Sequence, residues 1–224
     1  MKLIEFKKKF DKLSKKGFVP SKRNGPTGIG YTLEKMLGIK ENNIALPDLH
    51  EAELKSHRSN SNNLITLFTF NNKVWKIPPL EAVKKYGSLD KNGRKGLYYT
   101  MSLKPNSAGL FLSVTDKDIS VRHIAGEVIA TWKLAKLSER FAQKIPAMIF
   151  VSAFTEERDG KEYFHFYRAQ LLKGTSAKIL CGQFMEDNVI IDLRDNGTTT
   201  NNQETGFGTN ENKLYKLFSS VSDL

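Results

Sequence analysis

The sequence has few of the features that build disulfide frameworks, zinc sites or membrane spans. It contains one cysteine, Cys181, which excludes an internal disulfide and a cysteine-based zinc site. Its longest apolar runs, such as residues 147–153, are far shorter than the roughly 20 residues that cross a bilayer. Charged side chains interrupt the first ten residues, so we expect no secretory signal there. These absences favour a cytoplasmic protein with no membrane partner.

Acidic residues are also in the minority. The 35 lysines and arginines exceed the 24 aspartates and glutamates, giving a net charge of +11 and a pI near 9.6. Such a surplus favours a polyanionic partner such as nucleic acid, although it also serves solubility alone. The hydrophobic content of 39% is sufficient for a folded core and excludes general disorder.

The spacing of apolar residues predicts a mixed α/β domain with a central, partly antiparallel sheet. Period-2 patterns predict strands at 52–56, 64–70, 96–103, 110–114, 147–154, 163–172 and 189–193. Helical spacing predicts helices at 2–16, from 27 or 28 to 37, at 131–145 and at 210–218. The stretch 196–212 is polar and nearly free of apolar side chains, which predicts a long loop.

Four charged residues form a candidate site around one predicted strand. Because side chains alternate along a strand, Glu53 and Lys55 point the same way while Leu54 points into the core. We expect a short connection to bring Asp48 beside Glu53, and two neighbouring carboxylates repel each other unless a cation lies between them. Few hard oxygen ligands suit Mg²⁺, which offsets charge on a scissile phosphate. Glu34 lies one helix away and can support this site.

The same spacing has a plainer interpretation. An acidic residue two positions before a lysine also occurs at Asp159–Lys161 and Glu211–Lys213, where a charged surface is expected. Glu53 and Lys55 could likewise form a salt bridge on an exposed hairpin, which would carry no chemistry.

Several short segments form a recognisable series along the chain. They are Gly30-Tyr31-Thr32-Leu33-Glu34, Leu37-Gly38, Pro47-Asp48, Glu53-Leu54-Lys55, and the stretches 64–69, 104–110, 169–174 and 190–194. In this order, from about residue 21 to 218, the chain resembles the PD-(D/E)xK nucleases of the MvaI/BcnI restriction-endonuclease family, which are related to the MutH mismatch-repair nickase.

The resemblance implies a restriction-endonuclease-like fold, with a central mixed sheet flanked by helices. It implies one nuclease domain over residues 1–224, with a catalytic core at about 24–115 and DNA-recognition elements at about 104–109 and 190–212. The implied activity is type II cleavage of double-stranded DNA by a monomer that nicks each strand in turn at a CC-x-GG-like site. The implied cofactor is Mg²⁺, with Mn²⁺ able to substitute. A cognate DNA methyltransferase is expected in the same prokaryotic or phage-infected cell.

The resemblance also assigns roles by motif. Asp48 and Glu53 become metal ligands together with the carbonyl of Leu54, Lys55 becomes the catalytic lysine, and Glu34 becomes the supporting acid. The residues expected at the DNA are Arg58, Asn106, Asp192, Arg194 and Thr205. For Asp192 and Arg194 the reason is also chemical, because Asp accepts from cytosine and Arg donates to guanine.

One segment departs from the family pattern. The family has a His-Gly-Thr-Gly-Phe-Arg-like segment for base recognition, whereas this chain reads Gln203-Glu204-Thr205-Gly206-Phe207-Gly208. Glycine cannot make the bidentate contact of arginine with guanine, so the recognition sequence does not follow from the family. Two alternatives also stay open: a strand-nicking repair nuclease that needs an activating partner, and a DNA-binding protein that does not cleave.

Overall fold

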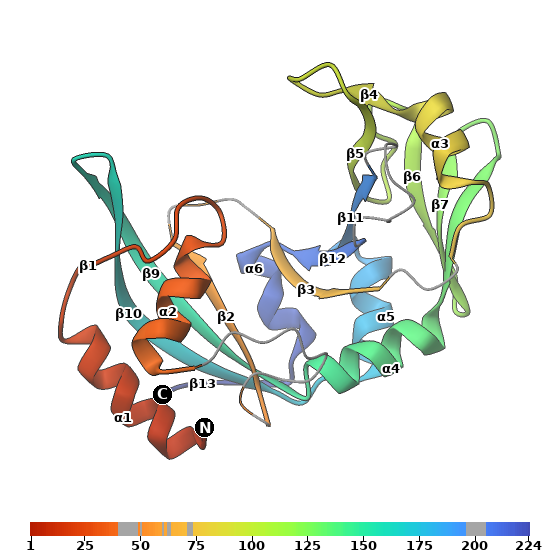
Figure 1. The fold of residues 1–224 in the computed structure, drawn as a ribbon. Helices are drawn as coiled ribbons and strands as arrows, with labels where there is room; N and C mark the ends of the chain where they lie inside the picture. The colour runs from red at the N-terminus through yellow and green to blue at the C-terminus, as the bar shows by residue number, and fades with distance from the viewer. Residues whose placement is uncertain (40–48, 50, 60, 62–63, 71–73, 196–204) are drawn as a thin grey trace. The chain divides into compact units, whose positions relative to one another are not determined.

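The computed structural model describes residues 1–39, 49, 51–59, 61, 64–70, 74–195 and 205–224, without the side chains of 194 and 195. The chain forms two compact units, whose elements are labelled in Figure 1. Unit 1 comprises Met1–Ile65, Gln143–Thr175 and Phe218–Leu224, and unit 2 comprises Thr66–Ala142 and Ser176–Leu217. The expected catalytic core at 24–115 therefore has residues in both units, and its action as one domain stays a prediction. Among the described residues, no helix has the length and apolar character needed to cross a membrane.

Unit 1 is built on a five-stranded sheet in the order β1-β10-β9-β2, with β13 also paired to β10. The strands β9 (Ala147–Arg158) and β10 (Lys161–Lys173) form a long antiparallel hairpin. The strand β2 (Glu53–Arg58) runs parallel to β9, with Glu53 opposite Met148. Both short strands that pair antiparallel with β10 lie near the chain ends: β1 (Val19–Pro20) and β13 (Ser220–Asp223).

Two helices pack on this sheet and close the core of unit 1. The helix α1 (Leu3–Ser14) buries one stripe, in which Phe6 and Phe10 stack with their ring centroids 5.8 Å apart. The helix α2 (Gly28–Leu37) lies against β2 (Figure 1). It ends at Gly38, which adopts the left-handed conformation with φ of 72° that a helix C-terminus favours. Both helices were predicted from the apolar spacing, and the structure confirms them.

Unit 2 contains two sheets and most of the remaining helices. One sheet has the order β3-β12-β11-β5-β4 and the other the order β6-β7-β8. The strands are β3 (Ile65–Thr69), β4 (Ser88–Leu89), β5 (Lys95–Met101), β6 (Leu110–Val114), β7 (Asp118–His123), β8 (Val128–Lys133), β11 (Ile190–Asp195) and β12 (Gly206–Thr209). The helices are α3 (Pro79–Tyr86), α4 (Leu134–Lys144), whose last two residues belong to unit 1, α5 (Ala177–Met185), α6 (Glu211–Leu214) and the 3₁₀ turn η1 (Tyr215–Leu217).

An aromatic cluster forms the centre of unit 2. The ring of Phe207 is fully buried and stacks on Phe68 with the centroids 4.8 Å apart. Trp132 and Phe184 meet the same ring edge-on at 5.7 and 6.1 Å, an arrangement that aromatic quadrupoles favour. The short strand β12 is thus fixed by a single large side chain.

The predicted mixed α/β architecture is confirmed, and a strand occupies each of the seven predicted positions. Two predictions were wrong in part. Residues 131–133 were assigned to a helix but belong to β8, because Trp132 pairs with Ile119 of β7 and α4 begins only at Leu134. The stretch 206–209, expected as loop, is the buried strand β12; residues 196–204 lie outside the described part of the chain.

Candidate active site

The predicted pair on β2 is brought together in unit 1. The carboxylate of Glu53 is 2% exposed, and its Oε1 lies 2.9 Å from the Nζ of Lys55. Leu54, between them, is buried in the hydrophobic core, as strand alternation requires. The exposed hairpin that formed the plainer alternative is not found, since β2 pairs in parallel with β9 and Glu53 is buried. Burying a carboxylate costs desolvation free energy, which nearby cations must offset.

A second lysine, which no sequence pattern singles out, contacts the same carboxylate. The Nζ of Lys144 lies 2.9 Å from Oε2 of Glu53, and its side chain is 17% exposed. Lys144 is the last residue of α4, and Pro146 follows just before β9 begins. The β2–β9 register sets Glu53 opposite Met148. Because β9 begins shortly after Lys144, this pairing places the end of α4 next to the Glu53 carboxylate. No sequence motif marks this contact.

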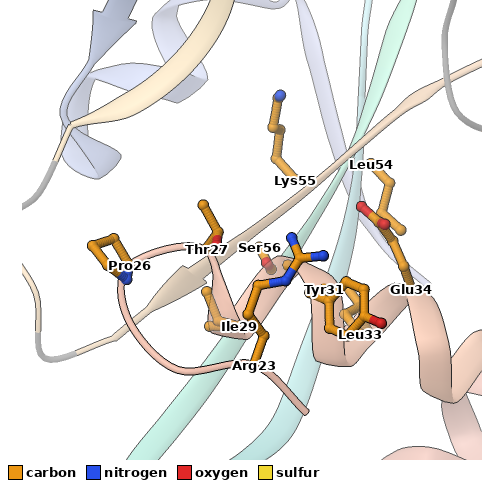
Figure 2. A pocket seen from close by; sticks show the side chains of 11 residues that line it. Arg23, Pro26, Thr27, Ile29, Tyr31, Leu33, Glu34, Leu54, Lys55 and Ser56 are labelled. Atoms are coloured by element: carbon orange, nitrogen blue, oxygen red, sulfur yellow. The ribbon is translucent and has the colours of Figure 1, made fainter. Parts of the chain in front are cut away.

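Lys55 also lines a pocket of about 330 Å³ between α2 and β2 (Figure 2). Glu34 of α2 lines the same pocket, and its supporting role stays a prediction. On the loop before α2, the guanidinium of Arg23 lies 3.7 Å from the ring centroid of Tyr31, which is cation–π distance. The side chains of Arg23, Glu34 and Tyr31 thus line this pocket, whereas the Lys55 side chain points away from them, toward Glu53 (Figure 2).

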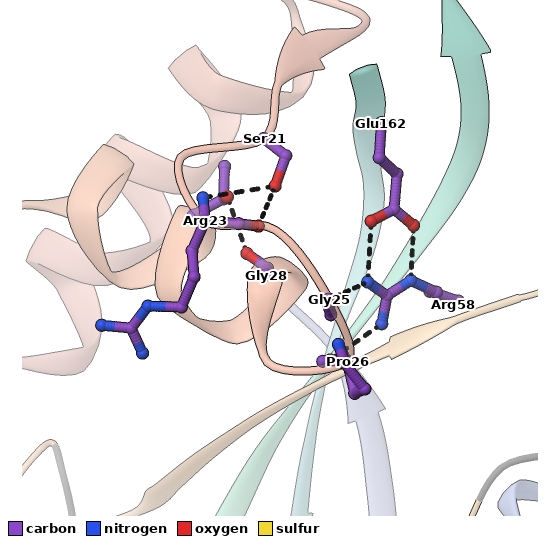
Figure 3. Close-up of polar contacts among 8 residues, drawn as sticks. Ser21, Arg23, Gly25, Pro26, Gly28, Arg58 and Glu162 are labelled. Carbon is purple, nitrogen blue, oxygen red and sulfur yellow. Dashed lines mark hydrogen bonds and ion pairs between the residues drawn. The ribbon is translucent and has the colours of Figure 1, made fainter. Parts of the chain in front are cut away.

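The loop that carries Arg23 is held by a set of local hydrogen bonds (Figure 3). The hydroxyl of Ser21 donates to the carbonyl of Arg23 at 2.7 Å, and the hydroxyl of Thr32 donates to the carbonyl of Gly28 at 2.7 Å. A Cβ at Gly28 would collide with the backbone carbonyl of Arg23, so only glycine permits this close approach. The loop is therefore fixed by its own sequence.

Arg58, predicted to contact DNA, is engaged within unit 1 (Figure 3). Its guanidinium donates from Nε and Nη2 to the two oxygens of Glu162 at 2.7 and 2.9 Å. It also donates to the carbonyls of Pro26 at 3.0 Å and Gly25 at 3.3 Å. Bidentate pairs of this kind combine strength with fixed geometry. Arg58 thus connects the end of β2, the hairpin strand β10 and the loop beside the pocket.

The other predicted metal ligand, Asp48, lies outside the described residues, so its approach to Glu53 stays a prediction. Among the residues that the structure describes, no three histidine, cysteine or acidic side chains form a metal-binding group. His57, on the same strand, is 6% exposed and stacks on Phe150 with the ring centroids 6.2 Å apart.

The remaining predicted DNA contacts belong to unit 2. Asn106 holds the turn between β5 and β6, because its side-chain oxygen accepts from the backbone N–H of Ala108 and of Leu110. Thr205 is 1% exposed, and its carbonyl accepts from the N–H of Phe70. Within β11, Asp192 pairs with Thr100 and Gly206, and Arg194 pairs with Tyr98. The contacts of all four residues with DNA stay predictions.

Comparisons with known proteins concern the family and the fold of the chain. The profile of the MvaI/BcnI restriction endonuclease family matches residues 7–220. A solved structure described as the restriction endonuclease MvaI–cognate DNA substrate complex is similar, with a TM-score of 0.83 and 22% identity over 100% of this chain and 99% of that one. A second, MvaI in the absence of DNA, gives a TM-score of 0.54 and 22% identity over 99% and 96%.

A comparison with curated protein sequences gives no significant match. The solved structures establish the fold, and the family profile covers nearly the whole chain. The chain belongs to the MvaI/BcnI restriction endonuclease family and is a site-specific deoxyribonuclease.

Proposed function

We propose that this enzyme hydrolyses phosphodiester bonds of double-stranded DNA with Mg²⁺, acting as a monomer that nicks one strand and then the other. The observation that supports this most is the buried Glu53 carboxylate beside Lys55, at 2.9 Å on one face of β2. A buried acid and a lysine two residues apart on a strand are the metal-ligand and charge-stabilising groups that such hydrolysis needs.

Enzymes of this family generally use a divalent metal ion, and the described residues suit one. Glu53 offers a hard carboxylate oxygen in a buried setting, the kind of ligand that Mg²⁺ prefers. Asp48, Glu53 and the Leu54 carbonyl would hold the ion, with Glu34 in the adjoining pocket. When bound, the ion supplies charge neutralisation at the scissile phosphate.

The roles of the protein groups follow from their positions. Lys55 orients the attacking water and stabilises the negative charge that develops on the phosphate oxygens. The water oxygen bonds to phosphorus, the bond from phosphorus to O3′ breaks, and the water proton leaves while O3′ takes up a proton. The products are a 5′-phosphate and a 3′-hydroxyl.

Recognition is proposed for unit 2 through Asp192 and Arg194, which sit on one strand with the donor and acceptor chemistry that reads G·C pairs. A short CC-x-GG-like site is the family expectation, and the replacement of its His and Arg by Gln203 and Gly208 changes the contacts available to read it. We expect a cytoplasmic enzyme of a prokaryote or phage, accompanied by a methyltransferase that protects the host DNA.

Plasmid digestion tests this proposal. The purified protein is incubated with fully matched supercoiled DNA and Mg²⁺ or Mn²⁺, and the ends are sequenced. We expect nicked circles before linear product, cuts at one short sequence, and loss of cleavage in Asp48→Ala and Glu53→Gln. Glu51→Gln, an exposed acid two residues before Glu53, is the matched control and retains activity.

The same assay separates the alternatives. A repair nickase would depend on an activating partner, so cleavage by the protein alone excludes that alternative. Tight binding to one sequence without cleavage, in both metals, would identify a non-cleaving DNA-binding protein. Activity equal to wild type in Glu53→Gln would refute the site assignment.

A further inference from the structure

Two aromatic side chains of the β9–β10 hairpin are exposed and packed on each other. Phe154 is 43% exposed and Tyr167 is 37% exposed, and their rings stack with the centroids 4.1 Å apart. The ring of His165 lies 6.3 Å from that of Phe154 and 5.6 Å from that of Phe18. We call these four residues the aromatic row. Exposed patches of touching apolar groups mark interaction sites on soluble proteins.

The aromatic row lies on the same face of the sheet as the candidate catalytic pair. Lys55 of β2 is opposite Phe150 of β9, and Phe154 follows on that face because side chains alternate along a strand. Four residues of a strand extend about 13 Å. The helices α1 and α2 pack on the other face, where Leu54 and Ala153 join their core. The row is therefore on the side of the sheet that approaches a substrate at Lys55.

A β-bulge turns two successive side chains of β10 to this face. The pairing of β10 with β9 shifts between Phe166 and Arg168, so Tyr167 is the extra residue of the bulge. Phe166 and Ala169 are buried, whereas Tyr167 and Arg168 are both exposed. Bulges change the direction of side chains and are frequent next to active sites. Regular pairing would turn only one of the two exposed residues outward.

Tyr167 gives the aromatic row a polar end. Its hydroxyl lies 3.1 Å from the hydroxyl of Ser59, which directly follows β2. One of these hydroxyls donates to the other, so the second O–H hydrogen is left for an acceptor outside the pair. Tyrosine and serine hydroxyls donate to phosphate oxygens in many protein–DNA complexes. The ring of Phe154 next to this pair offers an apolar surface to the adjoining deoxyribose.

We propose that the aromatic row and the Ser59–Tyr167 hydroxyl pair bind the sugar–phosphate backbone of the duplex, within one helical turn of the bond that is cleaved. This rests on the proposed function, which places the scissile phosphate at Lys55. A duplex at Lys55 is within reach, because about 13 Å of strand is less than half of a helical turn of about 34 Å. DNA is favoured over a protein partner because the chain has a net charge of +11, which suits a polyanion.

Photocrosslinking identifies what lies against the aromatic row. The variant Phe154→p-benzoylphenylalanine is irradiated with a duplex of about three helical turns in Ca²⁺, and we expect a covalent protein–DNA product. Ile4 is the matched control, because it is 71% exposed on α1, which packs on the opposite face of the sheet. The same substitution at Ile4 should give much less of this product. A product that joins two protein chains through position 154, with no DNA attached, would identify a second copy as the occupant and overturn the proposal.

The affinity for the same duplex in Ca²⁺ is the second measurement. Tyr167→Phe keeps the stacked ring and removes the hydroxyl, so binding should weaken by about tenfold, as for the loss of one hydrogen bond to a charged group. Its salt dependence should not change, because no charge is removed. Phe154→Ala should weaken binding by about three- to tenfold through lost apolar contact, and Ile4→Ala should bind like the wild type.

Two results would overturn the inference: unchanged affinity in both Tyr167→Phe and Phe154→Ala, or equal cross-linking to DNA from positions 154 and 4. Neither measurement needs cleavage. A protein that cross-links to DNA through position 154 and does not cut it would therefore refute the proposed function and not this surface.

Discussion

The two units of the molecule differ in how far their charged side chains are buried. In unit 1, Glu53 is buried beside the half-buried Lys55 and Lys144, and the pair Arg58–Glu162 is half-buried as well. In unit 2, the pairs that the structure describes are largely exposed, as in Lys133–Asp118, where the lysine is 71% exposed. Exposed pairs contribute little to stability, whereas buried pairs are costly and are kept where a function needs them.

The two units also differ in what holds them together. The core of unit 1 is a helix-on-sheet layer of mainly aliphatic residues and phenylalanines from α1, α2 and the sheet. The core of unit 2 centres on the rings around Phe207. Stability in unit 2 should therefore depend strongly on one aromatic side chain, while activity should depend on charges in unit 1.

The largest expected effect is on folding, through Phe207. Phe207→Ala removes a fully buried ring from the centre of the aromatic cluster, which should cost about 3–5 kcal/mol in the free energy of unfolding. The measurement is urea denaturation followed by tryptophan fluorescence. Phe154→Ala is the control in unit 1; its ring is 43% exposed, so the expected cost is below about 1 kcal/mol. Equal costs would contradict the comparison.

Phe207 lies in a strand that is too short to be predicted from the spacing of its apolar residues. Alternation or a continuous apolar run, counted over at least five residues, predicted seven strands. The strand β12 has only four residues, in the sequence Gly-Phe-Gly-Thr, so no period can be counted. In the same way, the predicted start of the helix at 131 was wrong, because Trp132 fits both a helical stripe and the β7–β8 ladder, while residues 134–144 are helical as predicted. In both cases the strand forms because it pairs with a neighbouring strand, β11 for β12 and β7 for β8.

The next largest effect concerns cleavage, through Lys55. Lys55→Met removes the ammonium next to Glu53 and keeps most of the side-chain length, so it should lower the single-turnover rate by about 10²–10³-fold. DNA binding in Ca²⁺, measured by gel shift, should change little, since one charge among many is lost. Lys136→Met, which is exposed in unit 2, should cleave like the wild type; a similar loss there would remove the distinction between the units.

Part of this site could be read from the sequence and part could not. Glu53, Leu54 and Lys55 are adjacent on a strand, so their spacing alone gives their relative directions. Lys144 is brought in by the register of β2 with β9, which no local pattern specifies. The engagement of Arg58 with Glu162 likewise depends on the β9–β10 hairpin, and the sequence offered only its charge.

A smaller effect is expected for Arg58, in unit 1. Arg58→Met removes four hydrogen bonds to Glu162 and to the carbonyls of Gly25 and Pro26, which should cost about 2 kcal/mol of unfolding free energy. The loop beside the pocket also loses its anchor, so cleavage should fall by about tenfold. Urea denaturation and single-turnover cleavage are the measurements.

A double-mutant cycle decides between the two roles of Arg58. If it acts by holding the loop, Arg58→Met and Glu162→Gln should be coupled by about 1 kcal/mol or more. If it instead binds a DNA phosphate, stability should stay unchanged and the salt dependence of DNA binding should decrease by about one charge. The second outcome would support the prediction that Arg58 contacts DNA and would contradict its role as an anchor of the loop.

The smallest effect is expected at an exposed cluster of unit 2. The hydroxyl of Tyr86 and the ammonium of Lys85 both donate to the carboxylate of Glu127, and they lower its pKa below the usual 4.5. A carboxyl whose pKa is lower in the folded state stabilises the fold above pH 4.5, and this contribution is lost as the pH falls through its folded pKa. Glu127→Gln should therefore lower the melting temperature slightly at pH 6 and not at all well below pH 4.5.

Tyr86→Phe is the matched variant, because it removes the donor that lowers the pKa of Glu127 most. Its melting temperature should show a weaker pH dependence than that of the wild type over the same range. The size of these changes should stay well below that of Arg58→Met, since the exposed pair is screened by solvent. If Glu127→Gln is destabilised equally at pH 6 and at pH 3, the carboxylate acts through packing. The contrast between a charge-dependent unit 1 and a charge-tolerant unit 2 would then rest on the buried groups of unit 1 alone.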